Sequence, residues 1–125
     1  MMSGDSVVLD TNIVLYLLKG DDKLEALLQG ANVFLSVITK VELLSHPDLD
    51  EAGEQVIREL LQSVKLMEFT STIQERTVLL RRQFKMKLPD AVIAATAAFL
   101  NIRLITADKK FARLKDELDV LLIER

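Results

Sequence analysis

Short apolar segments alternate along this chain with longer segments whose apolar residues recur every three or four positions. The short segments are residues 6–9, 32–36, 66–69, 103–106 and 120–123, and each has the length and composition of a buried strand. Helical spacing falls between them, and the helix predicted at residues 89–100 is rich in alanine and apolar on nearly every face. Strands that alternate with helices predict a parallel sheet with helices on its faces.

The other helices are predicted at residues 12–18, 22–28, 37–45, from about 48 onward, and from 71 or 72 to about 86. Ser71 with Gln74, or Thr72 with Glu75, has the spacing of a capping box at the start of the last of these. No linker, repeat or low-complexity segment interrupts the pattern. We therefore expect residues 1–125 to form one α/β domain.

Composition narrows the class of protein. Hydrophobic residues make up 50% of the 125 residues, which is enough for a substantial core. No apolar run approaches the ~20 residues needed to span a bilayer, the N-terminus shows no export signal, and there is no cysteine. We expect a cytoplasmic protein that does not enter the membrane.

The net charge of −3 argues against a generic nucleic-acid-binding protein, which is usually basic. That objection weakens if acids are concentrated in one site, because the remaining surface is then locally basic. Two clusters of basic residues suit this idea, although each is also typical of a solvated helix face. They are Arg81, Arg82, Lys85 and Lys87, and Lys109, Lys110, Arg113 and Lys115.

Four acidic residues, Asp10, Glu42, Asp90 and Asp108, each stand where a predicted strand ends or a helix begins. In a parallel sheet these positions gather at one edge, so carboxylates from the whole chain are expected to share a site. Carboxylates ~4–5 Å apart repel by roughly 3–4 kcal/mol per pair at an effective dielectric near 20. Bound protons or a divalent cation must offset this repulsion, and a cation gives the site a chemical use.

Each acid also has a purely structural explanation. Asp10 and Asp108 can cap helices, Glu42 has capping-box spacing from Thr39, and Asp90 suits the positive end of a helix dipole. Two observations favour the shared site. Asp90 lies on the same face of its helix as apolar residues, where an unpaired charge is costly, and Asp10 ends a strand expected at the centre of the sheet.

The chemistry of the acids points to a hard metal. Oxygen ligands without cysteine, and with a single histidine, fit Mg²⁺ or Mn²⁺ rather than Zn²⁺. Mg²⁺ takes one or two carboxylates, keeps several waters and completes its shell with phosphate oxygens, so the expected substrate is a phosphate ester or phosphodiester. His46 precedes Pro47 and is interpreted as a helix-end residue.

The segments that hold the four acids resemble the motifs of PIN domains over nearly the whole chain. They are Val8-Leu9-Asp10-Thr11-Asn12-Ile13, Leu35-Ser36-Val37-Ile38-Thr39-Lys40-Val41-Glu42-Leu43, Leu88-Pro89-Asp90-Ala91-Val92-Ile93-Ala94-Ala95-Thr96-Ala97, and Leu104-Ile105-Thr106-Ala107-Asp108-Lys109-Lys110-Phe111. The third is the most specific, because an aspartate that opens an alanine-rich helix is not a general core pattern. The chain length is similar to that of VapC-like toxins of prokaryotic toxin–antitoxin pairs.

This resemblance implies a three-layer α/β/α fold around a mainly parallel sheet of about five strands. It also implies a toxin that is a metal-dependent endoribonuclease. Asp10, Glu42, Asp90 and Asp108 would be its catalytic residues and would bind one or two Mg²⁺ or Mn²⁺ ions.

The residues expected to support this metal site are Thr11, Asn12 and Thr106. Family members often carry another acid two positions after the fourth one. Here that position is Lys110, which cannot supply a carboxylate ligand and so argues against a full second metal site. Lys110 and Lys109 are instead candidates to contact substrate phosphate. The implied partners are RNA, a small antitoxin that docks on apolar helices, and a second copy of the chain in a homodimer.

Two other functions are alternatives for a chain of this length and pattern. A phosphoacceptor receiver domain needs an acid pair after the first strand, a phosphorylated aspartate after the middle strand and a lysine after the last one. Here Asp10 is followed by Thr11, the middle strand ends in Thr70 and Ser71, and no such lysine is present. The second alternative is a PIN-like domain that does not cleave and serves as a binding or regulatory partner.

Overall fold

Within residues 4–124, which the computed structural model describes, five parallel strands form one sheet in the order β3-β2-β1-β4-β5. The strands are Ser6–Leu9 (β1), Asn32–Ser36 (β2), Lys65–Met67 (β3), Arg103–Thr106 (β4) and Val120–Leu122 (β5). β1 lies at the centre, as predicted, with Val8 paired to Phe34 of β2 and to Leu104 of β4. β3 ends two residues before the predicted boundary.

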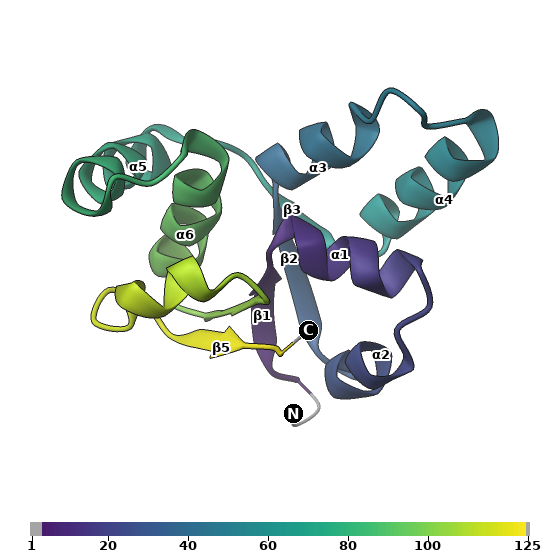
Figure 1. Ribbon diagram of the computed structural model, residues 1–125, viewed down its shortest axis with the longest axis horizontal. Coiled ribbons are helices and arrows are strands. Elements are labelled where there is room, and N and C mark those ends of the chain that lie inside the picture. Colours follow the sequence, from purple (N-terminus) through teal and green to yellow (C-terminus); the bar gives the residue numbers. More distant parts are fainter. Residues whose placement is uncertain (1–3, 125) are drawn as a thin grey trace.

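Helices connect the strands and cover both faces of the sheet (Figure 1). They are Thr11–Leu18 (α1), Asp22–Leu28 (α2), Val37–Leu44 (α3), Glu51–Gln62 (α4), Ser71–Phe84 (α5) and Leu88–Leu100 (α6), with a 3-10 helix at Lys109–Leu114 (η1). Figure 1 shows α5 and α6 on one side of the sheet and α1 and α2 on the other. Among residues 4–124, no helix is long and apolar enough to cross a bilayer.

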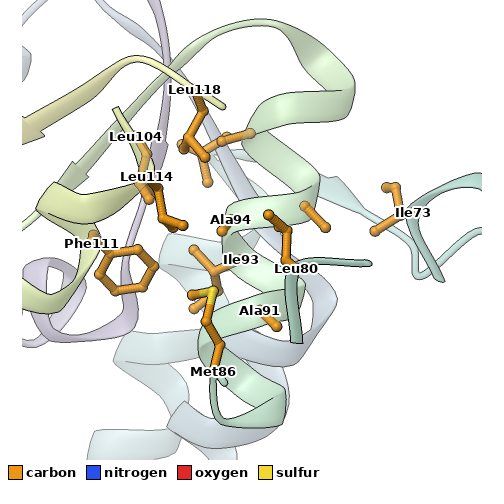
Figure 2. Packing of buried hydrophobic residues seen from close by; sticks show 13 residues of the cluster. Ile73, Leu80, Met86, Ala91, Ile93, Ala94, Leu104, Phe111, Leu114 and Leu118 are labelled. Carbon is orange, nitrogen blue, oxygen red and sulfur yellow. The ribbon is translucent and has the colours of Figure 1, made fainter. Parts of the chain in front are cut away.

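The central strand contributes to two cores because its successive side chains point to opposite faces. Val8 packs in a cluster with residues of α5, α6 and η1, whereas Val7 and Leu9 pack with residues of α1, α2, α3 and α4. Figure 2 shows the first cluster, where Phe111 of η1 and Ile93 of α6 lie close to Leu104 of β4. A sheet buried on both faces explains the continuously apolar strands, and the predicted three-layer α/β/α architecture is confirmed.

At two helices the N-cap differs from the capping residues that the sequence suggested. The N-cap of α3 is Ser36, whose hydroxyl accepts a hydrogen bond from the Ile38 amide at 3.1 Å. Thr39 is therefore inside the helix and forms no capping box with Glu42. The N-cap of α5 is Thr70, one residue before the predicted candidates.

Candidate metal centre

The four acids reach the same edge of the sheet by different routes. Asp10 directly follows β1 and is the N-cap of α1, and Asp108 follows β4 and is the N-cap of η1. Glu42 lies on α3, the helix that begins where β2 ends, and Asp90 lies in the first turn of α6. Because the strands are parallel, their carboxyl ends share one edge, and the helices that start there carry acids from positions 10 to 108 to it.

Asp10 is the buried acid of the group, with only 4% of its surface exposed. Its Oδ1 accepts a hydrogen bond from the Thr11 amide at 2.8 Å, so that the predicted capping role is present. Its Oδ2 accepts one from the buried Thr106 hydroxyl, also at 2.8 Å. A carboxylate offers about four lone-pair positions, and the two hydrogen bonds fix the group while leaving lone pairs for a further ligand.

A second set of hydrogen bonds fixes Glu42. The Thr11 hydroxyl donates to Glu42 Oε1 at 2.7 Å and lies 2.9 Å from the hydroxyl of Thr39, which is fully buried. A threonine hydroxyl has one hydrogen. Since Thr11 gives its hydrogen to Glu42, Thr39 donates to Thr11, and the three side chains form a directed chain from the core to the exposed acid.

Thr106 joins β4 to the same network. Its hydroxyl donates to Asp10 and accepts from the Asp108 amide at 3.0 Å, while Asp108 Oδ1 accepts from the Lys110 amide at 2.9 Å. One buried hydroxyl therefore sets both the orientation of Asp10 and the start of the segment that carries Asp108.

Burial and like charge raise the pKa values of two acids. The pKa of Asp10 rises from 3.8 to about 6, chiefly because the group is buried. Hydrogen bonds from Thr106 and Thr11 lower it, and the charges of Asp90 and Asp108 raise it. Burial likewise raises the pKa of Asp90, followed by the charges of Asp108 and Glu42. The four acids thus interact electrostatically, although up to 98 residues separate them in sequence.

Asp90 is half-buried, and among the described residues it accepts no side-chain hydrogen bond and forms no ion pair. Lys110 and Lys87 are near enough to lower its pKa, but neither makes a salt bridge with it. Asp90 is therefore the acid most open to a ligand from outside the chain.

The donor set fits a hard divalent cation of the Mg²⁺ type. Within residues 4–124, no three acidic or histidine side chains are placed so that together they could hold a metal ion directly. Electrostatic repulsion acts over longer distances, up to about the Debye length of 8–10 Å. Mg²⁺ usually binds one or two carboxylates directly and keeps several waters, so acids held apart in this way suit an ion that is bound partly through water.

Of the residues predicted to support the acids, two form hydrogen bonds to them within the described part of the chain and one does not. Thr11 and Thr106 bind the acids directly, but Asn12 is exposed and, within the described range, makes no hydrogen bond to them. Lys110 lines a cleft together with Asp90, whereas Lys109 lines another cleft next to β5. Thr39 was not predicted in this role: a threonine inside an apolar helix gave no signal that it would contact a residue 28 positions away.

Comparisons with known proteins bear on this arrangement. The family model described as "PIN domain" matches residues 7–117. The chain belongs to the PIN domain family. The match spans all four acids, and the resemblance seen in the sequence is confirmed. PIN domains generally use divalent metal ions, which agrees with the oxygen-rich chemistry of this edge.

Solved structures extend the likeness to toxin–antitoxin complexes. This PIN domain is 31% identical to a chain of a toxin–antitoxin complex from Klebsiella pneumoniae, with a TM-score of 0.82 over 95% of this chain and 99% of that one. It is 26% identical to a chain of VapBC-1 from nontypeable Haemophilus influenzae, with a TM-score of 0.74 over 94% and 97% of the two chains. It is therefore a VapC-like PIN domain.

A chain of VapBC2 from Rickettsia felis, bound to a DNA fragment from its promoter, shares the fold at 20% identity. Its TM-score is 0.79 over 95% of this chain and 99% of that one. Among curated proteins, none matches this chain.

Proposed function

We propose that this PIN domain is a metal-dependent endoribonuclease and the toxin of a type II toxin–antitoxin pair. One observation carries the proposal: four acids from distant parts of the chain lie toward one edge of the sheet, where burial and then the charges of neighbouring acids raise the pKa values of Asp10 and Asp90. An arrangement that costs stability in the free protein is expected where a cation will be bound.

Asp10 and Asp90 are the residues proposed to bind Mg²⁺ or Mn²⁺ directly, and Glu42 and Asp108 are proposed to complete the site. When bound, such a cation lowers the pKa of water and stabilises negative charge on a phosphate. The chain itself orients the acids. Thr106 and the Thr11 amide hold Asp10 in place, and the Thr39–Thr11 chain of hydroxyls holds Glu42.

The cleft beside Asp90 gives the substrate a place to enter. Lys110 lines this cleft, which holds about 310 Å³. The positive charge of an ammonium group next to the acids reduces the repulsion between these acids and an approaching, negatively charged phosphodiester. We propose that Lys110 contacts substrate phosphate, and the same role for Lys109 stays a prediction.

An antitoxin is the proposed protein partner, because the similar chains from K. pneumoniae and H. influenzae are in toxin–antitoxin complexes. An apolar groove of about 350 Å³ lies between α1, α2 and α4, with Val14, Leu17, Leu28, Leu60 and Val64 among its lining residues. A helix with an apolar face fits such a groove. The homodimer and the cytoplasmic location remain predictions.

The alternative is a PIN domain that binds without cleaving. To separate the two, the protein is purified with its co-purifying partner, stripped of it, and incubated with total RNA and Mn²⁺, with or without EDTA. Cleavage that EDTA abolishes, and that Asp90→Asn loses while keeping its fold by circular dichroism, supports the nuclease. Asp116→Asn, at an exposed acid two residues after η1, serves as the matched control. Undiminished cleavage by Asp90→Asn removes Asp90 from the mechanism, and no cleavage by the stripped wild type favours the binding protein.

A further inference from the structure

A cleft next to Asp90 concentrates positive charge on a chain whose net charge is −3. Four basic side chains line it: Lys85, Lys87, Lys110 and Arg113. They come from two separate parts of the sequence, the connection between α5 and α6 and the 3-10 helix η1. Asp90 is the one acid that lines this cleft, so its walls carry a surplus of positive charge.

The four cations are free to bind a ligand. All four are exposed, and within residues 4–124 none of them forms a salt bridge. The two ion pairs found there lie elsewhere, between Arg58 and Glu54 and between Arg103 and Asp119. The electrostatic effect of Lys110 and Lys87 on Asp90 shows that they stand near the candidate metal centre.

Two lining residues of the cleft belong to the hydrophobic core. Met86 and Phe111 line the cleft and are buried, at 8% and 1% exposure, within the core cluster of α5, α6 and η1 (Figure 2). The backbone segments that carry the four cations are therefore anchored to the core by neighbouring packed side chains.

Two of these lysines, Lys85 and Lys87, occupy positions between α5 and α6 where other residue types are usually favoured. Lys85 ends α5 with φ 55, in the left-handed region where glycine or asparagine is favoured. The same conformation at the end of α6 is occupied by Asn101. Lys87 is the N-cap of α6 and makes no side-chain capping bond, although serine, threonine, aspartate or asparagine would stabilise this position. Two nearby positions whose residues run against the usual helix-capping preferences point to a functional role for the side chains they carry.

We propose that this basic cleft binds the backbone phosphates of single-stranded RNA beside the bond to be cut, and does so without metal. The inference rests on the proposed function for the identity of the strand. Lysine and arginine bind phosphate oxygens by charge-assisted hydrogen bonds, which position a strand without reading its sequence. The cleft thus holds the substrate in register while Asp90, on its wall, faces the phosphate that reacts.

The test measures binding rather than cleavage. A fluorescein-labelled single-stranded RNA of mixed sequence is titrated with the protein in EDTA, and anisotropy gives Kd at several NaCl concentrations. Each lysine that neutralises a phosphate contributes about 0.7 to the slope of log Kd against log salt. Lys87→Gln and Lys110→Gln should each weaken binding about fivefold at ~0.1 M salt, and the double variant about 25-fold, with a slope lower by about 1.4.

Lys115→Gln is the matched control, since it removes the same charge from an exposed residue just after η1 that does not line the cleft. Thermal melts verify that every variant is folded. The inference is overturned if the double variant binds like the wild type, or if Lys115→Gln weakens binding as much as Lys110→Gln.

The outcome is separable from that of the proposed function. If wild-type protein binds RNA with the expected salt slope but does not cleave it with Mn²⁺, the cleft is an RNA-binding surface of a non-cleaving PIN domain. If the protein cleaves RNA while the cleft variants bind normally, the nuclease stands and the basic cleft does not hold the strand.

Discussion

Replacing Asp10 by asparagine should stabilise the metal-free protein at neutral pH, although it removes a residue proposed to bind the cation. Asparagine has nearly the same shape as aspartate, can still accept from the Thr11 amide, and can donate to the Thr106 hydroxyl. What it removes is a charge on a side chain that is 4% exposed and stands among other acids.

The magnitude follows from the pKa of Asp10, which burial raises from 3.8 to about 6. One pKa unit corresponds to 1.36 kcal/mol, so ionised Asp10 costs about 3 kcal/mol of folding free energy. Because the folded-state pKa is the higher one, the folded protein binds more protons between pH ~4 and ~6. Wild-type stability therefore falls as pH rises through this window, and the full cost is present above pH ~6.

We expect Asp10→Asn to gain about 2–3 kcal/mol at pH 7.5 in EDTA, or roughly 8–12 °C in Tm for a domain of this size. Near pH 4 most of the gain should be lost, because Asp10 is then protonated in the folded protein. Adding Mn²⁺ should raise the Tm of the wild type and leave that of Asp10→Asn nearly unchanged. Thermal melts followed by circular dichroism measure all three.

Asp116→Asn provides the control, because this exposed acid should shift stability by no more than ~0.5 kcal/mol at either pH. A wild type as stable as Asp10→Asn at pH 7.5 in EDTA would refute the reasoning. This result would mean that the ionised carboxylate of Asp10 does not destabilise the metal-free protein.

Three further changes probe the network and the core. Thr106→Val removes the donor to Asp10 and should raise the pKa of Asp10 further, so that Mn²⁺ binding measured by calorimetry begins at a higher pH than in the wild type; an unshifted profile would contradict this. Glu42→Gln keeps an acceptor for the Thr11 hydroxyl but removes the charge, so Mn²⁺ affinity should fall while Tm in EDTA is unchanged or higher; unchanged affinity would leave Glu42 with a structural role only. Phe111→Ala should destabilise the fold by about 3–5 kcal/mol in urea unfolding, since the side chain is 1% exposed, and a loss below ~1 kcal/mol would mean that this core is loosely packed.

The sequence alone predicted the sheet and the meeting of the acids because both follow from periodicity and chain direction. Residues 6–9 and 103–106 read as buried strands, and acids or threonines at the ends of parallel strands must share an edge. Asp10 and Asp108 are helix caps and also interact electrostatically at the candidate metal centre, so the structural and functional interpretations of these two residues do not exclude each other.

The hydrogen-bond partners could not be predicted in the same way. The chain from Thr39 through Thr11 to Glu42 depends on the rotation of α3 relative to α1, which no local pattern encodes. The capping box expected between Thr39 and Glu42 is absent because Ser36 already caps the helix. The basic clusters were visible in the sequence, but which of their members share a site was not. Arg81 turns to donate to the Met86 carbonyl, whereas the α5–α6 connection, the first turn of α6 and η1 together line one cleft.

The position of a bound ion tests the central claim most directly. Crystals of the protein soaked in Mn²⁺ and measured near the manganese absorption edge reveal the ion by its anomalous signal. We predict a peak between the carboxylates of Asp10 and Asp90, with Glu42 and Asp108 close enough to bind the ion directly or through water. A strong peak elsewhere, or none at this edge of the sheet while the acids are ionised, would contradict it.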